Sequence, residues 1–117
     1  ANQIIKIGNE ALSIEKVSLS TAVINNDPKQ EFISADGISN IFQIRNWQKG
    51  DKFYPIGMKG TKKVSDYLND IKMDTFNIKD QLVLINNNKI VWVIGKRLDD
   101  RFKITAATKK ALKLWLK

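Results

Sequence analysis

The sequence predicts a small α+β fold, a largely antiparallel β-sheet with one clear helix and a second, short one. Along most of the chain, short apolar and β-branched runs alternate with clusters of Gly, Asn, Asp and Pro, a pattern typical of strands joined by tight turns. One later segment instead has apolar residues at helical spacing. With 117 residues, 43% of them hydrophobic, the chain has the length of one domain and the composition of a folded protein.

Only short strands are predicted in the first part of the chain. The expected strands are residues 3–7, 12–19, 21–24, 32–35 and 41–45. Turn signals separate them at Gly8-Asn9, at residues 25–28 and at Asp36-Gly37.

A glycine-containing loop and the helix come next. Residues 47–60 hold three glycines and a proline among aromatic and aliphatic residues, so we expect an ordered loop that packs against the domain. Four apolar residues at positions i, i+3, i+4 and i+7 then predict the helix: Val64, Tyr67, Leu68 and Ile71. Thr61 is its expected N-cap, and Asp74 is expected to cap the short second helix, which runs to Lys79.

The last part of the chain predicts a buried hairpin. Residues 82–85 and 90–94 are continuous apolar runs, and the asparagines between them tolerate left-handed backbone angles. Because both runs are apolar on both faces, the hairpin is expected at the buried centre of the sheet. Residues 102–105 are expected to form a further strand. Residues 109–117 fit a strand through their alternating leucines and also fit a helical stripe; we favour a strand after a turn at residues 105–108.

Charge is distributed unevenly. The chain has 20 Lys and Arg against 12 Asp and Glu, for a net charge of +8. Residues 1–44 are slightly acidic, whereas residues 45–72 have a net charge of +4 and residues 89–117 a net charge of +7. This asymmetry favours an anionic partner such as nucleic acid for the second part of the chain, against the alternative that the lysines only solubilise the domain.

Composition excludes several kinds of chemistry. The chain has no His and no Cys, which removes disulfides, most metal sites, and mechanisms that use a thiol or an imidazole. Two carboxylate pairs, Asp66 with Asp70 and Asp99 with Asp100, are interpreted as ion-paired structural acids rather than acid/base groups. We therefore expect no catalytic residues and no metal. No apolar run approaches the length of a membrane span and no secretory signal is evident, so a soluble, cytoplasmic chain is expected.

Five basic residues are the candidate phosphate ligands. Lys62 and Lys63 lie at the expected helix start, where backbone N–H groups also attract anions. Arg97 and Arg101 follow the central hairpin, and Arg45 ends a strand. Arginine binds phosphate through two parallel hydrogen bonds, but structural ion pairs with Asp51, Asp99 or Asp100 are an equal alternative for these arginines.

The three tryptophans are candidates for stacking on bases. Trp92 lies within an apolar run and is expected in the core, whereas Trp47 and Trp115 remain open to either role.

Three blocks of sequence, in order, carry a resemblance to a known family. They are Ile44-Arg45-Asn46-Trp47-Gln48-Lys49-Gly50-Asp51-Lys52-Phe53 with Pro55-Ile56-Gly57-Met58-Lys59-Gly60, then Lys62-Lys63-Val64-Ser65-Asp66-Tyr67-Leu68, then Ile90-Val91-Trp92-Val93-Ile94-Gly95-Lys96-Arg97-Leu98-Asp99-Asp100-Arg101-Phe102. In these blocks the chain resembles the C-terminal domain of tRNA(Ile)-lysidine synthetase, the bacterial ligase that uses ATP to attach lysine to the wobble cytidine of an isoleucine tRNA. The resemblance begins near Phe42, which implies a family domain at residues 42–117 preceded by a β-rich lead-in or connector at residues 1–41.

The resemblance implies a role in holding tRNA rather than in chemistry. The family's N-terminal domain carries a Ser-Gly-Gly-x-Asp-Ser loop for ATP, used with Mg²⁺, and that loop is absent from this sequence. We therefore expect a fragment without cofactors whose partner is tRNA. A stand-alone RNA-binding or ribosome-associated protein, and a protein-interaction or dimerisation module, are the alternatives; oligomeric state does not follow from the sequence.

Overall fold

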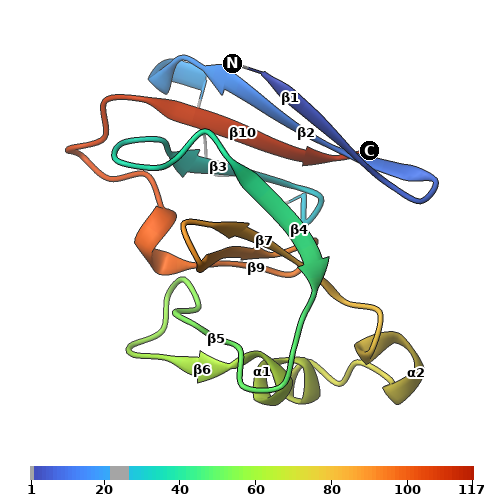
Figure 1. Ribbon diagram of the computed structural model, residues 1–117. Helices are drawn as coiled ribbons and strands as arrows, with labels where there is room; N and C mark the ends of the chain where they lie inside the picture. Colours follow the sequence, from blue (N-terminus) through green and yellow to red (C-terminus); the bar gives the residue numbers. More distant parts are fainter. Residues whose placement is uncertain (1, 22–26) are drawn as a thin grey trace.

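The computed structural model describes residues 2–21 and 27–117, which form three layers (Figure 1). The strands are β1 (Gln3–Ile7), β2 (Glu10–Val17), β3 (Gln30–Ser34), β4 (Phe42–Asn46), β5 (Lys52–Phe53), β6 (Lys62–Lys63), β7 (Leu82–Asn86), β8 (Lys89–Val93), β9 (Arg97–Leu98) and β10 (Ala111–Leu116). The helices are α1 (Val64–Asp70) and α2 (Thr75–Ile78), with 3-10 turns η1 (Leu19–Thr21) and η2 (Asp100–Phe102).

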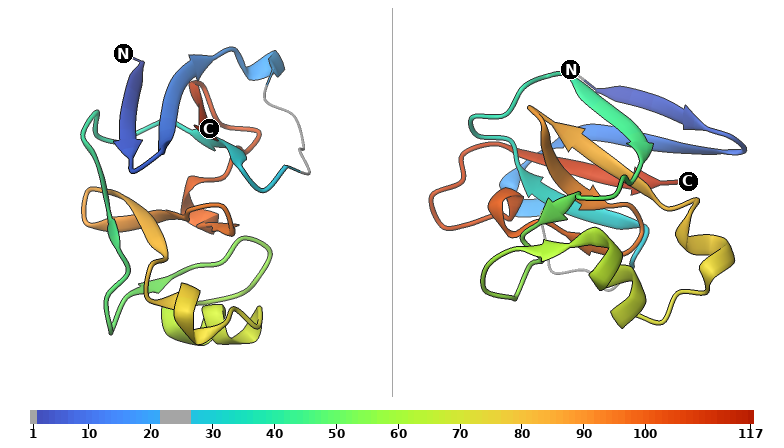
Figure 2. Two further views of the ribbon diagram at one scale, coloured as in Figure 1. Left: turned by 90° about the vertical axis from the view of Figure 1, so that its right-hand side faces the viewer. Right: turned by 60° about the horizontal axis from the view of Figure 1, so that its bottom comes forward.

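Among the described residues all the strand pairs are antiparallel, and the strands form two four-stranded sheets and one small ribbon. The first sheet has the order β1-β2-β10-β3, the second the order β4-β7-β8-β9, and β5 pairs with β6. Figure 2 shows the last strand, β10, inserted between strands from the beginning of the chain. The first sheet therefore joins residues from both sides of the expected boundary at residues 41 and 42, and that boundary stays a prediction.

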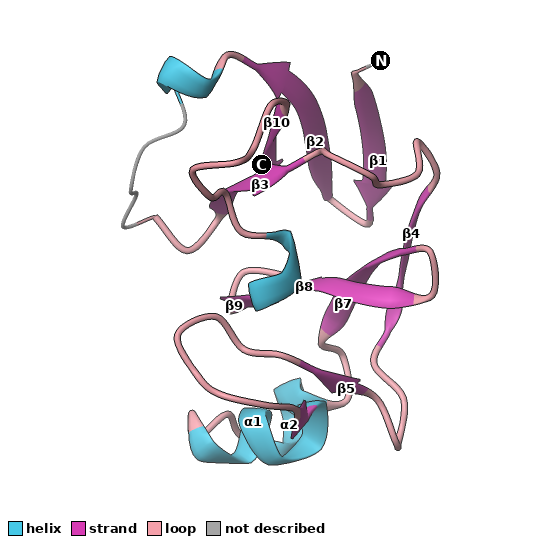
Figure 3. Ribbon diagram, turned by 90° about the vertical axis from the view of Figure 1, so that its left-hand side faces the viewer, coloured by secondary structure: helices cyan, strands magenta, loops and turns pink. Residues whose placement is uncertain are grey.

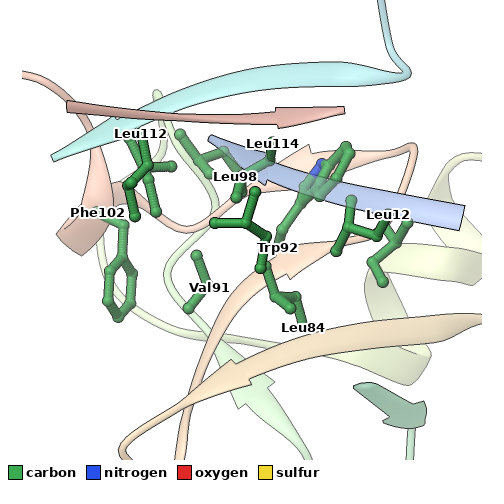
Figure 4. Close-up of a cluster of buried hydrophobic side chains, with 11 residues drawn as sticks. Leu12, Leu84, Val91, Trp92, Leu98, Phe102, Leu112 and Leu114 are labelled. Atoms are coloured by element: carbon green, nitrogen blue, oxygen red, sulfur yellow. The ribbon is translucent and has the colours of Figure 1, made fainter. Parts of the chain in front are cut away.

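The main core lies between the two sheets and centres on Trp92 (Figure 4). The Trp92 side chain is fully buried, and residues from both sheets pack around it, among them Leu12, Leu84 and Leu114. Leu12 and Ile14 of β2 and Leu112 and Leu114 of β10 belong to this core, which is the two-residue period of a strand with one face on a core.

A second core lies on the other face of the second sheet, where α1 packs. It contains Phe53, Val64, Tyr67, Leu68, Val83, Ile85, Ile90 and Val93. The rings of Phe53 and Tyr67 meet edge to face, with their centroids 5.4 Å apart. The β7–β8 hairpin is therefore covered on both faces, as its continuous apolar runs predicted.

Most local predictions are confirmed. Asn87 and Asn88 have φ values of 54° and 63° in the hairpin turn, and the Asp74 carboxylate accepts from the Asn77 N–H to cap α2. The C-terminal segment is a strand, and the Thr108 N–H donates to the Thr105 carbonyl in the turn before it.

Three details of the prediction are wrong. Thr61 is not the N-cap of α1, because Lys62 and Lys63 pair with β5 and the helix begins only at Val64. The Val64 N–H instead donates to the carbonyl of Asp51. Leu19 belongs to η1 rather than to β2, which ends at Val17.

Residues 102–105, the third error, do not form a strand. The Asp99 carboxylate accepts a hydrogen bond from the Arg101 N–H and so starts the 3-10 turn η2. A side-chain acceptor at this position gives the backbone a local partner in place of the hydrogen bonds between strands. Of the strand expected at residues 21–24, Thr21 ends η1 and the rest lies outside the described residues.

Within the described residues, no helix has the length and apolar character that a membrane span requires.

The packing of β10 predicts a large loss of stability on truncation of Leu114. We expect Leu114→Ala to lower the free energy of unfolding by about 2 to 5 kcal/mol, since it leaves a cavity between the two sheets. Ile4→Ala, at a side chain that is 70% exposed in the same sheet, is the control and should change it by less than about 0.5 kcal/mol. Urea denaturation measures both, and equal effects would contradict the assignment of this core.

Candidate nucleic-acid interface

A basic hollow of about 290 Å³ is lined by residues on or next to β4, β5, the β7–β8 hairpin and η2. Figure 3 shows where these elements lie in the fold. Four of its lining residues are cations: Arg45, Lys52, Lys89 and Arg101. Tyr54 contributes an aromatic ring and Asp51 the acidic group of the lining. We refer to this site as the basic hollow.

Arg45 is fixed at the hollow by Asp51. Its Nη1 and Nη2 donate to the two carboxylate oxygens of Asp51 at 2.8 and 3.1 Å, and the Gln48 N–H donates to the same carboxylate at 2.7 Å. Burial alone would raise the pKa of Asp51, but the hydrogen bonds from Arg45 and Gln48 and the guanidinium charge lower it below its usual value. The hydrogen bonds to Asp51 likewise raise the pKa of Arg45.

Arg101 is held in a similar way by Asp99, whose side chain is fully buried. The Arg101 Nε and Nη2 each donate to a carboxylate oxygen of Asp99 at 3.0 Å, and the Tyr54 N–H donates to the same carboxylate at 2.9 Å. The guanidinium carbon of Arg101 also lies 4.4 Å from the centroid of the Tyr54 ring. Side chains of both residues remain partly exposed, so this stacked pair presents a flat cationic surface to solvent.

The lysines of the β5–β6 ribbon face different environments. Lys52 and Lys63 lie directly opposite each other, both exposed, and neither has an ion-pair partner among the described residues. Like charges opposite each other in a sheet are destabilising, and a bound anion relieves that repulsion. Lys62 instead forms an ion pair with Asp70 at the end of α1.

Arg97 is directed into the domain rather than toward the hollow. Its Nη2 donates to the Ile56 carbonyl at 2.8 Å, which ties the glycine-containing loop to β9. Its charge also partly offsets the rise that burial causes in the pKa of Glu31 and of Tyr67. These contacts favour the structural alternative for Arg97.

The structure therefore divides the five candidate phosphate ligands. Arg45 and Arg101, each paired with a carboxylate, share one hollow, and Lys63 lies on the adjoining ribbon opposite Lys52. Lys62 and Arg97 bond to Asp70 and to the Ile56 carbonyl and do not line the hollow. Sequence reasoning missed Lys52, Tyr54 and Lys89. The position of Lys89 directly after the predicted Asn turn was the available signal for a cation at a hairpin tip.

Trp47 and three of the four paired acids have partners within the domain. Trp47 packs against the second core, and its Nε1 donates to the Ile78 carbonyl at 2.6 Å. Of the two carboxylate pairs, Asp70, Asp99 and Asp100 each form an ion pair with a lysine or arginine. Within the described ranges, no cluster of three or more His, Cys, Asp or Glu side chains is arranged to hold a metal.

Comparison with known sequences gives consistent matches. The family model of the TilS substrate C-terminal domain matches residues 42–115. The tRNA(Ile)-lysidine synthase of Bacteroides thetaiotaomicron is 44% identical over 78 residues, which cover 67% of this chain and 18% of that protein. The tRNA(Ile)-lysidine synthase of Parabacteroides distasonis is 35% identical over a segment that covers 86% of this chain and 23% of that protein. The one from Clostridium tetani is 31% identical over a segment that covers 96% of this chain and 26% of that protein. The chain thus spans about a quarter or less of the length of these relatives.

A solved structure has the same fold. The crystal structure of a TILS C-terminal domain superposes with a TM-score of 0.82 over 98% of this chain and 89% of that chain, at 15% sequence identity. At that identity the match supports the architecture, including the first sheet that residues 1–41 help to build.

The Arg45–Asp51 pair predicts a stability difference that depends on pH. Asp51 has a lower pKa in the folded chain than in the unfolded one. Its contribution to the free energy of unfolding is therefore fully present above the unfolded-state pKa of about 3.9, and it is lost as the pH falls through the lower pKa of the folded state. We expect Asp51→Asn to cost about 1 kcal/mol of unfolding free energy at neutral pH. This difference from the unsubstituted chain should shrink below about pH 4 in urea titrations; a constant difference would contradict the ion pair.

The contacts of Arg97 predict a thermal effect. Arg97→Ala should lower the melting temperature and reduce the free energy of unfolding by about 1 to 3 kcal/mol, because the Ile56 carbonyl loses its charged hydrogen-bond donor. Lys96→Ala, at an exposed neighbouring residue, is the matched control and should leave the melting temperature unchanged. If Arg97→Ala melts like the control, Arg97 does not brace the loop.

Proposed function

The chain belongs to the TilS substrate C-terminal domain family, and from this we propose that it is the tRNA-binding C-terminal module of a tRNA(Ile)-lysidine synthetase. It positions the isoleucine tRNA while another part of the enzyme uses ATP and Mg²⁺ to attach lysine to the wobble cytidine. The relatives extend far beyond the matched segment, which supports a catalytic domain outside this chain. We accordingly expect no cofactor here, and a cytoplasmic parent enzyme working where tRNA is found.

The basic hollow with the adjoining Lys52–Lys63 pair is the observation that carries this proposal. Two exposed lysines directly opposite each other repel in the free chain, and bound phosphate groups would offset that repulsion. Lys89 lies across the same hollow and extends the cationic surface to the hairpin tip.

The arginines supply orientation rather than net attraction. Arg45 and Arg101 each keep a carboxylate partner, so each pair is close to neutral overall and its guanidinium is held rigidly in place. A fixed guanidinium can donate its remaining N–H groups to a phosphate or a ribose hydroxyl with little loss of side-chain entropy. Lys62 and Arg97 instead bond within the domain, to the Asp70 carboxylate and to the Ile56 carbonyl.

Such a surface suits the outside of an RNA stem. Contacts to phosphate fix affinity and register but carry no base identity, and A-form stems are recognised mainly by shape, phosphates and 2′-hydroxyls. The proposed module therefore places the tRNA, and selection of the base that reacts belongs to the catalytic part.

The salt dependence of tRNA binding tests this proposal. The double variant Lys52→Ala with Lys63→Ala should weaken binding of isoleucine tRNA and reduce the slope of log affinity against log salt by about 0.7 to 0.9 per lost phosphate contact. Fluorescence polarisation with labelled tRNA at several salt concentrations measures the slope.

Lys62→Ala is the matched control, because it removes a neighbouring lysine that already has a carboxylate partner. We expect its salt slope to stay close to that of the unsubstituted chain. A double variant with an unchanged slope and an unchanged melting temperature would show that this surface does not contact the RNA backbone.

A further inference from the structure

The outer face of the first sheet carries an exposed indole. Side chains alternate along β10, so Leu112 and Leu114 point into the main core while Trp115 points away from it and is 36% exposed. Trp115 lies opposite Ser13 of β2, and Ser13 lies opposite Ile4 of β1, whose side chain is 70% exposed. In Figure 1 this sheet is the uppermost layer, at the opposite end of the molecule from the β5–β6 ribbon.

Lysines surround this indole. Lys113 and Lys117 are two residues before and after Trp115, so all three side chains share one face of the strand. Lys117 exchanges two backbone hydrogen bonds with Ala11, which in turn lies opposite Lys6 of β1. We call the set of Ile4, Lys6, Lys113, Trp115 and Lys117 the Trp115 face.

The ring of Trp115 is in contact with charge. The ammonium groups of Lys113 and Lys117 lie 4.3 and 4.6 Å from the centroid of its ring system. At an exposed site each such cation–π contact contributes only about 0.5 to 1 kcal/mol, so a flat aromatic group that stacks on the ring can displace the ammonium groups. The displaced lysines stay beside the ring, where they can neutralise phosphates attached to such a group.

Charge indicates which occupant this face fits. The outward-facing residues of β1, β2 and β10, together with Lys117, include three lysines and one acidic residue, Glu15, which accepts a hydrogen bond from Ser13. Protein interfaces are depleted of lysine at their centres, whereas surfaces that bind single-stranded nucleic acid combine cations with an exposed aromatic ring. An indole flanked by lysines on an open sheet matches the second kind of surface.

We propose that the Trp115 face binds an unpaired stretch of RNA, with one base stacked on the Trp115 indole and the neighbouring phosphates held by Lys113, Lys117 and Lys6. This extends the proposed tRNA-binding function, on which it rests, from paired to unpaired nucleotides. It assigns the two kinds of RNA to different surfaces, the stem to the basic hollow and the single strand to the Trp115 face. Stacking is tolerant of base identity, so the face adds affinity and orientation without reading sequence.

Binding of two RNA probes to the 117-residue chain tests this assignment. The probes are a labelled short oligouridylate, which has no paired bases, and a labelled blunt-ended RNA duplex. We expect Trp115→Ala to weaken oligouridylate binding by about tenfold or more and to leave duplex binding unchanged. Trp115→Phe, which keeps an aromatic face, should retain most of the oligouridylate affinity.

Phe76→Ala is the matched control. Phe76 is also an exposed aromatic residue with a lysine ammonium, that of Lys79, 5.0 Å from its ring centroid, but it lies on α2 away from the Trp115 face. We expect it to change neither affinity. Lys113→Gln with Lys117→Gln keeps the indole and removes charge, and it should reduce the salt dependence of oligouridylate binding only.

Several results would overturn the proposal. Unchanged oligouridylate affinity in Trp115→Ala would exclude stacking on this indole. Duplex binding without oligouridylate binding in the unsubstituted chain would reject the Trp115 face while leaving the proposed function intact. Self-association that Trp115→Ala abolishes, with no oligouridylate binding, would assign the face to a second copy of the chain. Oligouridylate binding that depends on Trp115, with no binding of tRNA or duplex, would support the face and count against the proposed function.

Discussion

Burial of the β7–β8 hairpin on both faces is the constraint on which the other layers depend. One face packs against the first sheet around Trp92, and the other packs against α1 and Phe53. Apolar burial is the dominant stabilising contribution in a chain of this size, and a hairpin with two apolar faces is stable only when both are covered. The ribbon that carries Lys52 and Lys63, and the helix that follows it, are therefore positioned by the same hairpin that supports the first sheet.

Charged groups are organised around two carboxylates. Asp99 is fully buried, each of its carboxylate oxygens accepts from Arg101, and the backbone directly after β5 is tied to it through the Tyr54 N–H. A buried carboxylate is tolerated only when paired and hydrogen-bonded in this way, and breaking such a pair leaves an uncompensated charge. Asp51 does the same for Arg45 at the rim of the hollow. The two acids thus orient the arginines of the candidate interface.

The two proposed RNA surfaces differ in the physics on which they rely. The basic hollow combines exposed lysines with guanidinium groups held by carboxylates, which suits a rigid stem with regularly spaced phosphates. The Trp115 face offers an indole flanked by two lysines on an open sheet, which suits nucleotides that can be unstacked. The two surfaces lie on different layers of the structure, which would let one domain hold two regions of the same RNA.

The sequence by itself determined the antiparallel α+β fold, the buried hairpin with its Asn turn, the cap of α2 and the basic character of the second half, because these depend on local periodicity, turn chemistry and composition. The predicted strand at residues 102–105 failed because the Asp99 side chain formed a local turn, which strand propensity alone does not reveal. Only the tertiary structure decided which acids pair with Arg45 and Arg101, that Lys52 faces Lys63, and that β10 joins the first strands and turns Trp115 outward. Each of these depends on register between segments far apart in the chain, and a shift of one residue in a strand would reverse which side chains face the core.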